Sequence, residues 1–134
     1  MTDAQTALAR RAVACKGWRW VPGMATVQGE RVVLMDDDGT LRLAAPWGGT
    51  VGVTAVRSFF DSGGACLPDL TDPATLGCLL ALVREAWGDE RTAVKWWEPE
   101  GCAYYAHPLD TWRPPATLFA SEAEALVAAL ESAP

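Results

Sequence analysis

Apolar residues recur at helical intervals near both ends of the chain and in one long segment between them. The first of these segments covers residues 3–15. Thr2 and Gln5, at its start, have the spacing of a capping box, and Gly17 follows its end. The last segment covers residues 122–132, and Ser121 and Glu124 have the same capping-box spacing at its start. These patterns predict an N-terminal and a C-terminal helix.

The strongest helix signal lies at 73–87. Asp72 is a good N-cap residue, Pro73 occupies the first helical position, and Gly88 follows the last turn. Apolar side chains surround nearly the whole segment, which is typical of a helix that is buried on more than one side. We therefore expect it to be the central helix of the fold, or to meet a second subunit with its outer face.

β-branched and alternating positions predict several extended segments. Segments 18–27, 30–35 and 40–44 follow one another with short turns between them, which predicts a three-stranded antiparallel meander. Segments 93–97 and 102–106 flank a proline-containing turn and predict a hairpin. We expect one α+β domain, in which the meander and the hairpin pack on the central helix.

The stretch 45–70 is the least regular part of the chain, and no strand or helix is predicted there. Its run Gly48-Gly49-Thr50-Val51-Gly52 lacks the Gly-Lys-Ser/Thr ending that a phosphate-binding loop needs. A glycine-rich turn is the simpler interpretation.

Composition and charge argue against several classes of function. The net charge is −6, and the one basic cluster, Arg10, Arg11 and Lys16, is typical of a solvated helix face, so we expect no direct binding to nucleic acid. No apolar run is long enough to span a membrane, and the N-terminus does not resemble a signal peptide. The protein is therefore expected in the cytoplasm, with no membrane contact.

Catalytic and metal-binding patterns are also missing from the sequence. The four cysteines include no C-x-x-C pair, and His107 is the single histidine. We expect free thiols, no metal and no cofactor. The alternative is a small enzyme that uses Cys66 as a nucleophile or a pair of carboxylates, although the spacing of these residues in the sequence gives it no support.

Seven tryptophans are more than a core of this size needs to bury. Several stand beside arginine, and an indole can stack on a flat ring while a guanidinium binds phosphate. The candidate ligand-binding residues are Trp18, Arg19, Trp20, Trp47, Trp112 and Arg113. In the alternative interpretation, Trp18 and Trp20 pack in the core, and the functional surface lies on the hairpin around Trp96 or Trp97.

Three segments carry a resemblance to small proteins encoded by phages and prophages. They are 16–24 (KGWRWVPGM), 67–77 (LPDLTDPATLG) and 120–126 (ASEAEAL), about a fifth of the chain. The first segment is also similar to the opening of the Thoeris anti-defence sponge proteins, which sequester a nucleotide signal, although the spacing before Gly23-Met24 differs by one residue. The resemblance implies a phage setting, and no binding residue is carried over from it.

We therefore expect a phage-encoded, non-enzymatic binding protein that acts in the host cytoplasm. It would sequester a nucleotide-like small molecule or block a host defence protein. The alternatives are an accessory protein that makes protein–protein contacts in replication or assembly, and a small enzyme. The apolar surface of segments 73–87 and 93–106 further predicts a homodimer.

Overall fold

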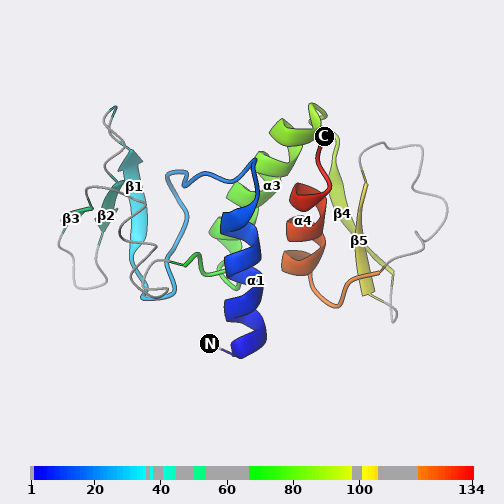
Figure 1. The fold of residues 1–134 in the computed structure, drawn as a ribbon, viewed down its shortest axis with the longest axis horizontal. Coiled ribbons are helices and arrows are strands. Elements are labelled where there is room, and N and C mark those ends of the chain that lie inside the picture. The colour runs from blue at the N-terminus through cyan, green and yellow to red at the C-terminus, as the bar shows by residue number, and fades with distance from the viewer. Residues whose placement is uncertain are drawn as a thin grey trace.

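The computed structural model describes residues 2–35, 37, 41–44, 50–53, 67–97, 101–105 and 118–134. Within these residues the chain forms an α+β fold with three helices and two antiparallel sheets (Figure 1). In chain order the elements are α1 (Asp3–Ala14), β1 (Arg31–Met35), β2 (Leu41–Ala44), β3 (Thr50–Val53), α3 (Pro73–Trp87), β4 (Ala93–Trp97), β5 (Gly101–Tyr105) and α4 (Glu122–Glu131).

The helices begin where their caps predicted. At α1 the Thr2 hydroxyl accepts a hydrogen bond from the Gln5 amide (3.1 Å), and the Gln5 side chain accepts one from the Thr2 amide (2.9 Å). At α3 the Asp72 carboxylate accepts from the Thr75 amide (2.8 Å). Ser121 caps α4 in the same way. These bonds satisfy amide groups that have no partner inside their helix.

The three helices run in the same direction (Figure 1), so their C-terminal ends lie together at one end of the molecule. Helix α4 lies in the middle and contacts α1, α3, β4 and β5. The prediction that α3 is the central helix is therefore wrong. The physical reason is the composition of α4, in which small residues such as Ala125 and Ala129 alternate with the buried Leu126 and Val127 and let its neighbours approach closely.

The first sheet has the order β1-β2-β3, and both pairings are antiparallel. The prediction of the three-stranded meander is wrong in which segments form its strands. Segment 18–27 forms isolated bridges, Ala25 with Arg31 and Thr26 with Pro68, in place of a strand. The third strand is instead β3, which lies in the stretch where no regular element was predicted. Gly23, at φ 104°, turns the chain in a way that a regular strand does not allow.

The two sheets lie on opposite sides of the helices (Figure 1). The hairpin β4–β5 confirms the prediction for that segment, and it pairs at Cys102 with Phe119, just before α4. The first sheet is joined to the helices through residues 25–27, which hydrogen-bond to 67–69. Segments 25–27 and 67–69 therefore link this sheet to α3, whereas the sequence had suggested that the sheet packs directly on that helix.

A hydrogen-bonded network connects the first sheet to the start of α3. The Arg31 guanidinium of β1 donates to both oxygens of Asp72 (3.1 and 3.2 Å) and to the Gly23 carbonyl (2.6 Å). Asp72 also accepts from the Thr75 hydroxyl (2.8 Å), and that hydroxyl oxygen in turn accepts from the Ala25 amide (2.8 Å). Thr75 is fully buried, and its hydroxyl group finds both a donor and an acceptor within the protein.

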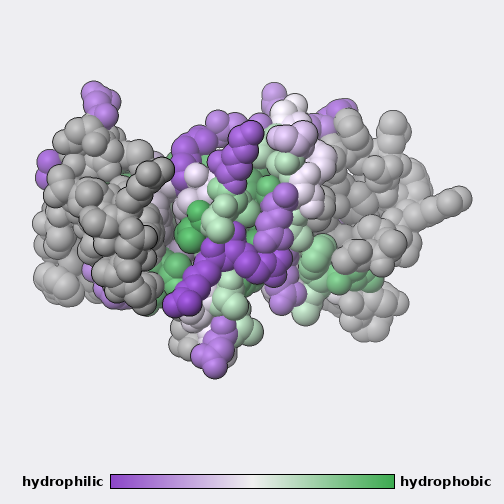
Figure 2. Space-filling model, viewed as in Figure 1, coloured by the Kyte–Doolittle hydropathy of each residue, from purple (hydrophilic) through white to green (hydrophobic). Residues whose placement is uncertain are grey.

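One hydrophobic core extends from Val32 and Leu43 of the first sheet, through Met24 in the connecting loop, to Leu79 of α3 and Leu130 of α4. Hydrophilic side chains cover much of the face on which α1 lies, with hydrophobic surface visible between them (Figure 2). Among the described helices, none has the length and apolar character that crossing a membrane requires.

Candidate functional site

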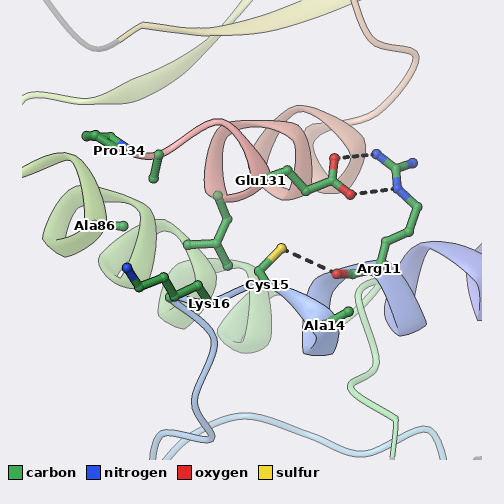
Figure 3. Close-up of a pocket in the computed structure, with 10 residues that line it drawn as sticks. Arg11, Ala14, Cys15, Lys16, Ala86, Glu131 and Pro134 are labelled. Atoms are coloured by element: carbon green, nitrogen blue, oxygen red, sulfur yellow. Dashed lines mark hydrogen bonds and ion pairs between the residues drawn. The ribbon is translucent and has the colours of Figure 1, made fainter.

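A cleft of about 500 Å³ opens where α1, α3 and α4 end (Figure 3). A cleft of this size lies in the range of small-molecule sites. Its lining residues are Arg11, Ala14, Cys15, Lys16, Gly17, Ala86, Leu130, Glu131, Ala133 and Pro134. A second groove, of about 290 Å³, lies where the same three helices begin, and its surface is mainly apolar.

The chain passes close to α3 and α4 at Gly17. A Cβ atom at Gly17 would lie 3.0 Å from the Leu130 Cδ1 atom and 3.4 Å from the Ala86 Cβ atom. The first distance is too short for a relaxed contact. The small residues at this point therefore bring the C-terminal end of α1 close to α3 and α4 and shape the floor of the cleft.

An ion pair closes one side of the cleft. The Arg11 guanidinium donates to both oxygens of Glu131, at 2.9 and 2.8 Å (Figure 3). This bidentate contact lowers the pKa of Glu131 below its ordinary value and raises that of Arg11. Both side chains are thus held in their charged forms, and they connect α1 to α4.

Lys16 is the charged side chain of the cleft that has no ion-pair partner among the described residues. It is exposed, and it extends away from the Arg11–Glu131 pair (Figure 3). A lysine ammonium in such a position can receive an anionic group from a ligand without first breaking a contact within the protein.

The thiol in the cleft is not activated. The Cys15 Sγ atom donates a hydrogen bond to the Arg11 carbonyl (3.3 Å), and burial raises the pKa of the thiol, with a further contribution from Glu131. Burial also raises the pKa of Cys78 and of Cys102. All three are free thiols that stay protonated near neutral pH, whereas a nucleophilic cysteine needs the thiolate.

The structure places the predicted Trp18-Arg19-Trp20 segment directly after the cleft residues. The two indoles face each other edge-on, with ring centroids 5.7 Å apart and planes at 80°. Trp20 is buried, with 4% exposed, and Trp18 packs against the same core. Arg19 is exposed and pairs with Glu85 of α3 (2.6 Å). These indoles therefore pack in the core, and the guanidinium beside them is already paired.

The remaining candidates divide into two groups. Trp47, Trp112 and Arg113 lie outside the described residues, as do Cys66 and His107 of the enzyme alternative. On the hairpin, Trp96 is 50% exposed.

The lining residues of the cleft were missed as site residues by sequence reasoning. Arg11 and Lys16 belong to the basic cluster that was interpreted as a solvated face, and Glu131, the partner of Arg11, lies 120 positions after it. The sequence signal that could have found the site is a pair of unlike charges in the last turns of the first and last helices. The sequence does not reveal that these two helices pack together.

Searches with this chain against protein-family models, curated proteins and solved structures found no match. Within the described residues, no group of three or more histidine, cysteine, aspartate or glutamate side chains could hold a metal ion.

Proposed function

We propose that the protein is a non-enzymatic binding protein that holds a nucleotide-like small molecule in the cleft where α1, α3 and α4 end. The observation that carries the proposal is the unpaired Lys16 ammonium on a cleft of about 500 Å³. In the phage setting implied by the sequence resemblance, such binding would sequester a nucleotide signal of the host.

The arrangement of the cleft supports binding more than chemistry. Its thiol is protonated, and its carboxylate, Glu131, is held by Arg11. A general base must be free to take a proton from the substrate, and neither group is free in this way. What the cleft offers is a cation, a small apolar floor and two paired charges, which are groups that orient a ligand.

The test combines ligand identification with a matched pair of variants. Small molecules released on denaturing protein purified from cells are identified by mass spectrometry, and a nucleotide panel is screened by thermal unfolding. A ligand at about a hundred times its dissociation constant adds about 2.7 kcal/mol to the free energy of unfolding. Lys16→Ala should abolish this stabilisation, whereas Arg10→Ala, which removes an exposed cation of α1 outside the cleft, should preserve it.

Stabilisation by a nucleotide that is equal in both variants would place the ligand elsewhere. If no small molecule is released and no nucleotide stabilises the wild-type protein, the proposal is wrong.

A second candidate, binding to another protein or to a second copy of the chain, is favoured by the exposed apolar side chains. Trp96 is 50% exposed, and Val33 and Leu34 are each 51% exposed. Tryptophan is enriched among residues that dominate protein interfaces. Sedimentation at micromolar concentration tests the homodimer: a dimer that Trp96→Ser converts to a monomer supports this candidate, and a monomeric wild-type protein counts against it.

A further inference from the structure

We propose that the cleft selects a ligand with a single negative charge and that it discriminates against polyphosphates. This inference rests on the proposed function, because it concerns the same cleft. It is derived from the direction of the three helices and from the pairing of the charges around the cleft.

The helix direction sets the background potential. An α-helix carries a partial negative charge at its C-terminal end, and its last carbonyl groups lack partners within the helix. Because α1, α3 and α4 all end at the cleft, their partial charges add there instead of cancelling. Antiparallel helices of the same lengths would have offset one another.

The charged side chains offset this potential only in part. Arg11 brings a positive charge to the cleft, but its bidentate pair with Glu131 neutralises it. Among the described charged side chains that line the cleft, Lys16 is left to balance the three helix ends. One anionic group beside Lys16 is therefore favoured, and each further negative charge meets the repulsion of the helix C-termini.

Carbonyl groups at these helix ends already accept hydrogen bonds within the protein, among them those of Arg84, Ala129 and Leu130. The selection therefore rests on charge. A phosphodiester brings one negative charge to Lys16. A nucleoside triphosphate brings several, and the described lining of the cleft holds no second free cation for it.

Adenine nucleotides of increasing phosphate charge test the inference directly. The probes are cyclic AMP, AMP, ADP and ATP without metal, titrated at low ionic strength and followed by isothermal calorimetry. Coulomb repulsion from the helix ends through water predicts a loss of affinity of about threefold for each added charge. Cyclic AMP should therefore bind most tightly, and raising the salt to a physiological concentration should reduce the differences.

Two variants make the result specific to the cleft. Glu131→Gln removes a negative charge and loosens Arg11, so it should flatten or reverse the order of affinities, whereas Arg10→Ala should leave the order unchanged. An affinity in the wild-type protein that rises from cyclic AMP to ATP would overturn this inference and leave the proposed function intact. If none of the four nucleotides binds, this inference is overturned, whereas the proposed function is decided by the released small molecules and the wider nucleotide panel.

Discussion

Replacing Asp72 by asparagine isolates the charge that connects the first sheet to α3. Asparagine caps helices about as well as aspartate, so the bond from the Thr75 amide can persist. In the native protein Arg31 and Asp72 form a bidentate ion pair, with distances of 3.1 and 3.2 Å. Asparagine carries no charge, so this contact loses its ionic character. The variant therefore measures the ion pair separately from the cap.

The magnitude follows from the pKa of Asp72. The hydrogen bonds from Arg31, with those from Thr75, lower this pKa from 3.8 to about 2. A shift of this size corresponds to about 2 kcal/mol of stabilisation. The Arg31 side chain is 44% exposed and that of Asp72 is 18% exposed, so screening by solvent reduces the expected contribution to about 1–2 kcal/mol.

The pH dependence gives the prediction its direction. A carboxylate whose pKa is lower in the folded state stabilises the fold fully above about pH 5, and the contribution is lost as the pH falls through 4 towards 2. Urea unfolding of the wild-type protein and of Asp72→Asn should therefore differ by about 1–2 kcal/mol at pH 7 and by about half as much at pH 3. The exposed pair partner Glu85, changed to glutamine, serves as the control and should alter stability little.

A difference between the wild-type protein and Asp72→Asn that is the same at pH 7 and at pH 3 would refute this reasoning. So would the absence of any difference at pH 7.

The remaining predictions concern packing and are all measured by urea unfolding. Leu126→Ala in the fully buried centre of α4 should lower the free energy of unfolding by about 2–5 kcal/mol, and Leu80→Ala in the half-buried part of α3 by less; the reverse order would contradict the packing of these two side chains. Gly101→Ala should be destabilising by at least about 1 kcal/mol, because φ is 134° and the new Cβ would lie 2.5 Å from the Phe119 carbonyl oxygen. Gly77→Ala, in an open position of α3, should stabilise by about 0.5–1 kcal/mol, and a loss of stability there would show that the site is not open.

Local signals predicted the helices and the hairpin well. Thr2, Asp72 and Ser121 mark the helix starts because capping depends on residues only three positions apart. The pairing of β4 with β5 is equally local, because Trp97 lies opposite Gly101. Such elements can be predicted because the groups that determine them are close in the sequence.

The position of α4 could not be predicted in the same way. Its alanines give a weaker hydrophobic pattern than the leucines of α3, yet small side chains let several elements pack around one helix. The sequence pattern measures how apolar a helix is, whereas its place in the fold depends on how closely its neighbours can approach.

The cleft depends on contacts between distant residues, and this is why it was missed. Lys16 and Arg11 are ordinary cations in the sequence. They become parts of a candidate site only because α1, α3 and α4 run in the same direction and end together. Trp18 and Trp20 were predicted to bind a ligand because they are indoles beside an arginine. They pack instead in the core, against residues that lie far away in the chain.

The most direct test of the central claim is an NMR titration of the ¹⁵N-labelled protein with cyclic AMP. If the cleft is the binding site, the largest shifts should appear at the amides of Lys16, Gly17, Ala86 and Leu130, and Lys16→Ala should remove them. Shifts that gather instead on the hairpin around Trp96, or a spectrum that does not change up to millimolar ligand, would contradict the account.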